Sequence, residues 1–315
     1  MTEVAVSAPL EAVALFLAGA VLAVWATERL LDGLLGLGAA MSLSTFAVGA
    51  VLSGFEAENV AVGLAAGAKS APDVALGTVF GGAIFLVCVA LGLGAVLYPL
   101  RVVLPRSVLI TMAITPLLVG IAVVGDRTSR WAGALLLASF AVAMGHLVIA
   151  SRRQVVIAPT TTPGSNERPS LAVSIVLTLV GLLGVGVGGE MVARGALGMV
   201  AVFGLSAGLV GMVITPVAIE LEEVIRQAVP TRKGHPEVSA GNLVGTLLYF
   251  VLFNFGLIAL LTPVAVGPRI RTLDWPFLTA VTWLAVLFLS RGEVGRREGA
   301  FLLAAYAAYV ILHAM

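Results

Sequence analysis

Long apolar runs separated by short polar segments dominate the chain. A helix that crosses the hydrocarbon core of a bilayer needs about 20 apolar residues. Ten runs approach that length, at about 9–27, 40–68, 72–98, 106–125, 131–150, 170–189, 203–228, 236–262, 275–290 and 298–314. The pattern therefore predicts an all-α integral membrane protein with ten transmembrane helices.

The strongest break in this pattern is residues 151–169, SRRQVVIAPTTTPGSNERP. The segment is rich in Pro, Thr and Arg, which is typical of an exposed linker. It divides the chain into a first five-helix unit at 1–150 and a second at 170–315. Because an odd number of spans inverts the second unit relative to the first, we expect two inverted five-helix repeats.

Two polar motifs support a duplication. The stretch from Ser53 to Phe85 matches the stretch from Ala218 to Tyr249 at a constant offset of 164 residues. Such a spacing across dissimilar residue types predicts that the two copies build one site. The matched pairs are Glu56 with Glu220, Glu58 with Glu222, Asn59 with Glu223, Lys69 with Lys233, Asp73 with Glu237, Gly77 with Gly241, and Gly81 with Gly245.

Composition agrees with a membrane protein and excludes other classes. Hydrophobic residues make up 60% of the chain and charged residues 11%, against about 25% charged in soluble domains. The net charge of +1 and the lack of a dense basic tract argue against nucleic-acid binding. A single cysteine, Cys88, excludes a disulfide framework and a cysteine-based metal cluster. The first apolar run lacks the basic start of a signal peptide, so we interpret it as a spanning helix.

Lysines and arginines in the loops predict the orientation. With the N-terminus outside, the inner loops hold eleven of them and the outer loops six. Basic residues concentrate in cytoplasmic loops. We therefore expect a multi-pass protein of the cell membrane with both termini outside and the linker in the cytoplasm.

Five carboxyls lie inside the apolar runs, and they are the first candidates for chemistry. Each charge at mid-helix costs about 2.5–3.5 kcal/mol, so the fold must compensate them with protons, cations or each other. An environment of oxygen atoms alone suits Ca²⁺, Na⁺ or protons. The five are Glu56, Glu58, Glu220, Glu222 and Glu223.

Glycine and proline near these acids predict broken helices at the site. Ser53-Gly54 and Thr215-Pro216 precede the acidic motifs, and the facing helices are expected to break at Gly77-Thr78, Gly81-Gly82 and Gly241-Asn242. Such breaks would present free carbonyl oxygens beside the carboxylates. The facing helices are expected to contribute Thr78, Asn242 and Thr246 as neutral oxygen ligands, and Asn59 is expected as a further neutral partner of the acids.

Structural interpretations compete with these. Glu56 and Glu58 are two residues apart, as are Glu220 and Glu222. Residues at this spacing diverge by about 200° in a regular helix, so one acid of each pair could face a water-filled vestibule or pair with Arg226. Asp73 and Glu237 each follow a proline, where a carboxylate at a helix start favours the helix dipole. No histidines have metal-ligand spacing and no nucleophile–base pair is evident, so we do not expect an enzyme or a bound cofactor.

The two motifs resemble a known family. PDVALGTVFGGAIF and PEVSAGNLVGTLLY are similar to the α-repeats of the calcium/cation antiporter superfamily, the sodium/calcium exchanger-like proteins. Their pattern is roughly GTSxPE, fourteen residues, then D-IALGN-VVGSNIFN. The resemblance covers both repeats and the ten-helix plan. It implies an alternating-access antiporter with an ion site at mid-membrane.

The resemblance also assigns residues. The ion-coordinating Glu of the family falls on Glu223 in the second repeat and on Asn59 in the first. The first Asn of the GN pair is Thr78 in one copy and is retained as Asn242 in the other.

Other family ligands are replaced. The Asn of GSN falls on Ala83 and Leu247, the Pro of each PE on Glu58 and Glu222, and the Ser of each GTS on Glu56 and Glu220. Fewer neutral ligands and more clustered carboxyls favour proton coupling as a hypothesis.

We therefore expect a secondary active antiporter that exchanges a divalent cation, with Ca²⁺ the first candidate, for H⁺ or Na⁺. Its expected partners are the lipid bilayer and small inorganic cations, and the sequence gives no oligomeric state. The alternative is an exchanger-like membrane protein with a changed substrate or with a non-transporting structural or partner-binding role. The lost Asn and Ser ligands favour that alternative, and the retained acids oppose it.

Overall fold

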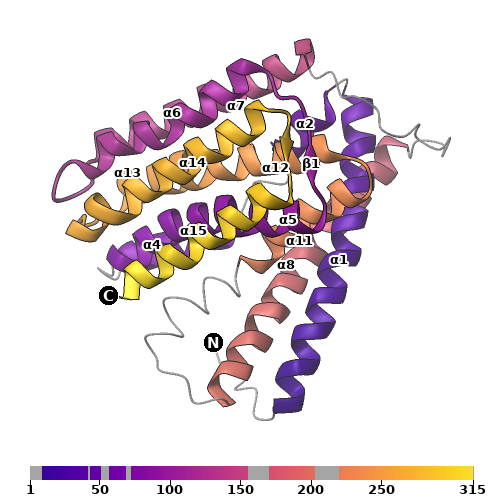
Figure 1. The fold of residues 1–315 in the computed structure, drawn as a ribbon, viewed down its shortest axis with the longest axis horizontal. Helices are drawn as coiled ribbons and strands as arrows, with labels where there is room; N and C mark the ends of the chain where they lie inside the picture. The colour runs from indigo at the N-terminus through magenta and orange to yellow at the C-terminus, as the bar shows by residue number, and fades with distance from the viewer. Residues whose placement is uncertain are drawn as a thin grey trace.

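Helices form nearly all of the structure (Figure 1). The computed structural model describes residues 9–41, 43–50, 57–68, 72–154, 170–202 and 220–314. Before the linker lie α1 (Pro9–Ala40), α2 (Thr45–Val48), α3 (Ala57–Ala68), α4 (Pro72–Phe85), η2 (Leu86–Ala90), α5 (Leu91–Leu97), α6 (Arg106–Val123) and α7 (Arg130–Gln154). After it lie α8 (Leu171–Val202), α11 (Leu221–Arg232), α12 (Pro236–Leu248), η4 (Tyr249–Asn254), α13 (Phe255–Leu261), η5 (Ile270–Asp274), α14 (Trp275–Ser290) and α15 (Arg296–Ala314).

Seven helical segments within the described ranges are long and apolar enough to cross a membrane, whereas the sequence predicted ten spans. They are 10–40, 75–97, 106–123, 130–150, 171–192, 236–261 and 270–290. The predicted spans at 40–68 and 203–228 lie partly outside the described residues. The predicted span at 298–314 falls within α15, whose first turn carries Arg296, Arg297 and Glu298.

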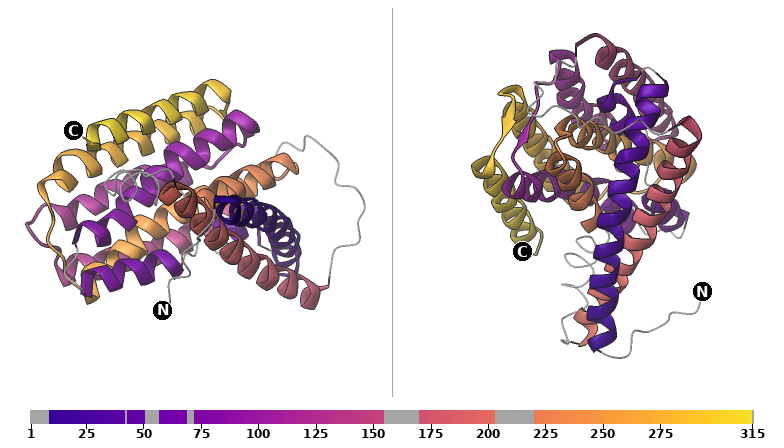
Figure 2. Two further views of the ribbon diagram at one scale, coloured as in Figure 1. Left: turned by 90° about the horizontal axis from the view of Figure 1, so that it is seen from below. Right: turned by 90° about the vertical axis from the view of Figure 1, so that its right-hand side faces the viewer.

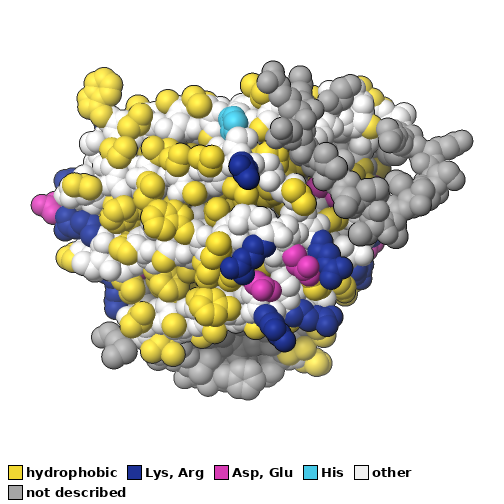
Figure 3. All heavy atoms as spheres, turned by 45° about the horizontal axis from the view of Figure 1, so that its top comes forward, with side chains coloured by type: hydrophobic (Ala, Val, Ile, Leu, Met, Phe, Trp, Pro, Cys, Tyr) yellow, Lys and Arg dark blue, Asp and Glu magenta, His cyan; other side chains and the backbone are white. Residues whose placement is uncertain are grey.

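The surface of these helices is apolar. Large hydrophobic side chains lie exposed where a soluble protein would bury them, including Leu10 at 80%, Val124 at 75% and Trp131 at 87% exposure. Figure 3 shows hydrophobic side chains across much of the visible face, with charged side chains gathered in a few patches. An apolar surface of this extent fits contact with lipid tails, so the chain is a multi-pass membrane protein.

Helices α1 and α8 lie side by side and project together from the rest of the molecule (Figures 1 and 2). Glycine allows their backbones to approach closely. A Cβ atom at Gly181 would lie 2.6 Å from the Cα atom of Leu30, and one at Gly188 would lie 2.8 Å from the backbone nitrogen of Ala23.

Helix α1 continues well past the predicted end at residue 27, so that boundary was wrong. Helix α8 also continues past residue 189, but its membrane-length stretch, 171–192, agrees with the predicted span. The charges just beyond the predicted ends are paired, and they do not end the helices. Glu28 pairs with Arg232 at 2.7 Å, and Glu190 pairs with Arg194 at 2.5 Å. Helix α7 runs on to Gln154, so it extends four residues into the predicted linker 151–169.

Most of the remaining large contacts also join residues before the linker to residues after it. Helix α6 packs on α14, α7 on α13, and α5 on α15. Strand β1 (Leu100–Arg101) pairs antiparallel with β2 (Glu293–Val294). An isolated bridge joins Arg127 to Ala265. The two parts of the chain are therefore interleaved.

The predicted breaks at Gly77-Thr78, Gly81-Gly82 and Gly241-Asn242 were wrong, because α4 and α12 are helical through those positions. The irregular backbone comes later, where α4 continues into the π-helix η2 and α12 into the π-helix η4. The breaks predicted near Ser53-Gly54 and Thr215-Pro216 lie outside the described residues.

The glycines of α12 instead let another segment approach. A Cβ atom at Gly241 would lie 2.3 Å from the carbonyl oxygen of Phe46, and one at Gly245 would lie 2.1 Å from that of Ala50. Because a side chain at either position would collide with backbone, the glycines bring residues 45–50 directly against α12. This contact lies next to the buried polar side chains described below.

Candidate cation site

The acidic residues of the second motif lie at the start of α11. Glu220 is the N-cap residue, and Glu222 and Glu223 lie in the first turn. Carboxylates are favoured there because the N-terminus of a helix carries partial positive charge. Glu220 is 4% exposed and Glu223 is fully buried, so the fold must compensate both carboxyls with polar partners.

One such partner comes from the other half of the chain. The Nδ2 atom of Asn59 on α3 donates a hydrogen bond of 3.1 Å to the Oε1 atom of Glu220. Both side chains are buried. This bond joins a residue of the first motif to a residue of the second across 161 positions of sequence.

Glu223 has an amide partner on α12. The Nδ2 atom of Asn242 donates a hydrogen bond of 3.0 Å to its Oε2 atom. Within the described residues, the Oδ1 atom of Asn242 and the Oγ1 atom of Thr246, one turn further along, accept no hydrogen bond, and both side chains are at most 1% exposed. Two buried neutral oxygens therefore lie on the helix that faces the acidic turn.

Arg226 neutralises part of the acidic turn. Its Nη1 atom lies 2.8 Å from the Oε1 atom of Glu223, and its Nη2 atom binds the Oε1 atom of Glu222. The guanidinium is 7% exposed, which makes these buried ion pairs. Pairing of Glu220 or Glu222 with Arg226 was one of the alternatives left open by the sequence, and the structure confirms it for Glu222. The pairing of Glu223 with Arg226 was not predicted.

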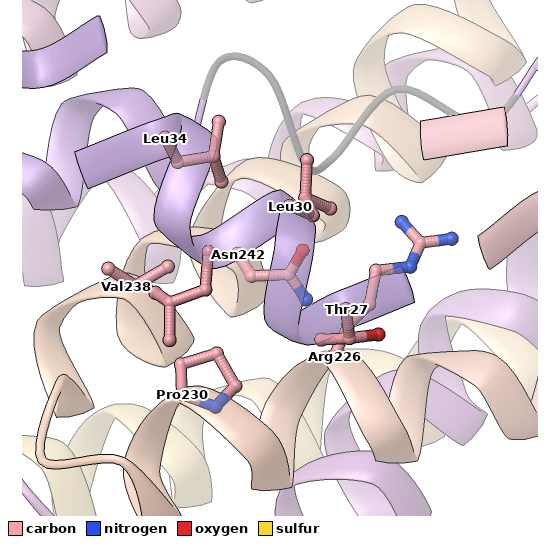
Figure 4. A pocket seen from close by; sticks show the side chains of 8 residues that line it. Thr27, Leu30, Leu34, Arg226, Pro230, Val238 and Asn242 are labelled. Carbon is pink, nitrogen blue, oxygen red and sulfur yellow. The ribbon is translucent and has the colours of Figure 1, made fainter. Parts of the chain in front are cut away.

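A small pocket opens beside this cluster, between α1, α11 and α12 (Figure 4). Thr27, Arg226 and Asn242 are among its lining residues, and the Oγ1 atom of Thr27 has no hydrogen-bond partner in the described structure. Leu30, Leu31, Leu34, Pro230 and Val238 line the rest. The accessible surface of the pocket is apolar, and its lining residues come from both halves of the chain.

Six of the nine predicted ligands are described in full, and they lie on α11 or on the helices beside it: Asn59, Glu220, Glu222, Glu223, Asn242 and Thr246. Glu58 lies on α3 and Thr78 on α4, but their side chains are outside the described structure, and Glu56 lies outside it altogether. Among described residues, no three Asp, Glu, His or Cys side chains are arranged to hold a metal ion. The described acids form hydrogen bonds with the amides of Asn59 and Asn242 and ion pairs with the guanidinium of Arg226.

Glu237 lies in the first turn of α12, where the sequence placed it as a helix-start carboxylate. It also receives a hydrogen bond of 3.2 Å from the Oγ1 atom of Thr45 and lies 3.2 Å from the Nδ1 atom of His235. The contact with Thr45 was not predicted, because no local sequence signal links residues so far apart.

Two further buried polar side chains were also missed. Asn254 in η4 is fully buried, and Gln227 on α11 is 2% exposed. Neither amide has a hydrogen-bond partner among the described residues. Asn254 could have been found from the sequence, because it is an amide inside an apolar run and such a group is costly to bury without a hydrogen-bond partner.

Comparison with known proteins identifies the family. The family described as "Sodium/calcium exchanger protein" matches residues 11–149 and 173–315. CaxA of Alkalimonas amylolytica is 25% identical over 94% of this chain and 96% of its own length. The inner membrane protein YrbG of Escherichia coli is 26% identical over 96% of each chain.

A solved structure shares the fold. The sodium-calcium exchanger NCX_Mj superposes with a TM-score of 0.79 over 98% of this chain and 99% of its own, at 22% identity. CaxA is named as a putative antiporter and NCX_Mj as a sodium-calcium exchanger, so these two proteins are named as secondary transporters and not as enzymes. The two matched segments cover most of the chain on either side of the linker, so the chain belongs to the sodium/calcium exchanger family of membrane transporters.

Proposed function

We propose that this chain is a secondary active antiporter that exchanges Ca²⁺, or another divalent cation, for Na⁺ or H⁺. The observation that carries the proposal is the buried cluster in which Asn59 contacts Glu220 and Asn242 contacts Glu223. Carboxylate and amide oxygens are ligands that Ca²⁺ and Na⁺ accept, and softer ligands are absent among the described members of the cluster. In this proposal Glu223 is the central ligand.

The proposed transport cycle is alternating access by two inverted repeats, 1–150 and 170–315, joined by the linker 151–169. The separate family matches on either side of the linker support this division. The pairing of α1 with α8 and of α6 with α14 also supports it, because related halves of a transporter pack their equivalent helices together around a central site. Rocking of one helix group against the other would expose the site to each side in turn.

The exchange itself would be a competition for the carboxyls. Na⁺ or protons neutralise them, the divalent cation leaves, and the reverse occurs on the other side. We propose Glu56, Glu58 and Thr78 as further ligands because the matched motifs place them opposite Glu220, Glu222 and Asn242. We also propose that both termini face outside and that the linker is cytoplasmic, as the basic residues of the loops predict.

The alternative is a family member with a changed substrate or with no transport. Arg226 is the observation that favours it, because a guanidinium binds carboxylate oxygens that a metal would need. The same cluster retains several buried acids, and burying them costs free energy. A chain that binds no ion would gain nothing in return. A binding measurement separates the two.

The test is thermal unfolding of the detergent-solubilised protein with and without Ca²⁺. A ligand that binds the folded state alone raises the melting temperature, so Ca²⁺ is expected to raise it and Glu223→Gln to abolish the rise. The matched control is Glu293→Gln, because Glu293 is a half-exposed carboxylate in β2 that pairs with Arg101. A Ca²⁺ shift that persists in Glu223→Gln would remove Glu223 from the site. No shift with Ca²⁺ or any other divalent cation would favour the alternative.

A further inference from the structure

We propose that Arg226 is a tethered cation that competes with the transported cation for Glu223. This inference rests on the cation site proposed above. It assigns to the arginine a role in setting how tightly that site binds, beyond the ligands that the family motif supplies.

Each carboxylate oxygen of Glu223 already faces one polar partner. Its Oε2 atom accepts from Asn242 at 3.0 Å, and its Oε1 atom lies 2.8 Å from the Nη1 atom of Arg226. The other terminal nitrogen of Arg226 binds Glu222. Because Arg226 follows Glu223 by three positions and Glu222 by four on α11, one guanidinium reaches both carboxylates from within the same helix.

A metal cannot occupy the position beside the Oε1 atom that the guanidinium now fills. Ca²⁺ binds carboxylate oxygens at about 2.3–2.6 Å, which is the space that the Nη1 atom now fills at 2.8 Å. An arginine side chain keeps its proton at every accessible pH, so its charge stays in the site. A cation that binds at this position must therefore displace Arg226, and a cation that binds elsewhere on Glu223 must overcome its repulsion.

Other oxygens are ready to complete the coordination once Arg226 moves. The Oδ1 atom of Asn242 and the Oγ1 atom of Thr246 are buried and have no donor among the described groups. Arg226 and Asn242 also border the pocket with Thr27, as Figure 4 shows. The pocket therefore adjoins both the competitor and a neutral ligand.

The competition has a second consequence. Without a bound cation, Arg226 is the positive charge that compensates two buried carboxylates. Removal of one partner of a buried ion pair leaves the other uncompensated and is strongly destabilising. The empty site should therefore lose stability when the arginine is replaced, and a metal ion should restore it.

The test compares Arg226→Gln with wild type in detergent, using Ca²⁺ alone as the probe. Isothermal titration is expected to give a Kd at least about tenfold lower in Arg226→Gln, because a fixed like charge has been removed from a site of low dielectric. Arg226→Lys keeps the charge and is expected to stay near the wild-type Kd. The control is Arg271→Gln, because Arg271 forms an ion pair with Asp126, whose side chain is 93% exposed.

Thermal unfolding supplies an independent readout. Arg226→Gln should melt below wild type without Ca²⁺ and gain more from saturating Ca²⁺ than wild type does. If Arg226→Gln does not fold, Glu222→Gln/Arg226→Gln is compared with Glu222→Gln alone, since the double variant restores charge balance. The double variant is then expected to bind Ca²⁺ more tightly than the single one.

Equal or weaker Ca²⁺ binding after loss of the arginine, in a background where wild type binds, would overturn this inference and leave the proposed function standing. A failure of Ca²⁺ to bind wild type and every variant would overturn the proposed function, and this inference with it.

Discussion

Gly245 lies where α12 meets the segment 45–50, and its replacement by alanine tests whether this contact holds the site together. A Cβ atom there would be 2.1 Å from the carbonyl oxygen of Ala50 and 2.7 Å from its Cα atom. Both are backbone atoms and cannot rotate away. The two segments would have to separate, and α12 carries Asn242, the partner of Glu223.

The magnitude follows from two opposing terms. Alanine favours a helix over glycine by about 1 kcal/mol. Overpacking of a well-packed interior costs about 1–3 kcal/mol, and a collision between backbone atoms belongs at the upper end. We therefore expect Gly245→Ala to lower the free energy of unfolding by about 2 kcal/mol.

The assay is denaturant titration in mild detergent, followed by tryptophan fluorescence. The control is Gly145→Ala, because Gly145 lies exposed in the middle of α7 with nothing within 4 Å of its added Cβ atom in the described structure. This control is expected to be neutral or stabilising. If Gly245→Ala were as stable as Gly145→Ala, the argument that α12 needs glycine for close approach would be refuted.

Three further predictions follow from other contacts. Asn59→Leu removes the donor to the buried Glu220 and should lower the free energy of unfolding by about 1.5–3 kcal/mol in the same titration. An unchanged free energy of unfolding would mean that the hydrogen bond between Asn59 and Glu220 does not stabilise the fold. Tyr309→Phe removes the hydroxyl that donates at 2.8 Å to the buried Asp274 and should cost a similar amount, about 1.5–3 kcal/mol; an unchanged midpoint would contradict this. In a Cys88→Ser background, Ser165→Cys should react with a membrane-impermeant maleimide from the cytoplasmic side, and reaction from outside would reverse the proposed orientation.

The acidic candidates could be found from sequence because the cost of burying charge is a local property. A carboxyl in an apolar run must have a partner, whatever the fold. The matched offset then paired Asn59 with Glu223, whereas the structure pairs Asn59 with Glu220 and gives Glu223 to Asn242. Sequence thus indicated which residues gather, and the packing of α3, α11 and α12 decided which ones touch.

The glycines show what sequence could not decide. Glycine permits both a broken helix and a close approach of two backbones, and its presence in the sequence does not show which of the two occurs. At Gly241 and Gly245 the answer depends on Phe46 and Ala50, which are about two hundred residues earlier in the chain. The contact of Thr45 with Glu237 was unpredictable for the same reason.

The most direct test of the account is uptake of ⁴⁵Ca²⁺ into proteoliposomes under an imposed Na⁺ gradient and, separately, an imposed pH gradient. We expect at least one gradient to drive uptake in wild type and in Glu293→Gln, and we expect that uptake to be lost in Glu223→Gln. The gradient that drives it names the coupling ion. Absence of uptake under both gradients, or equal uptake in Glu223→Gln, would contradict Ca²⁺ exchange at this site.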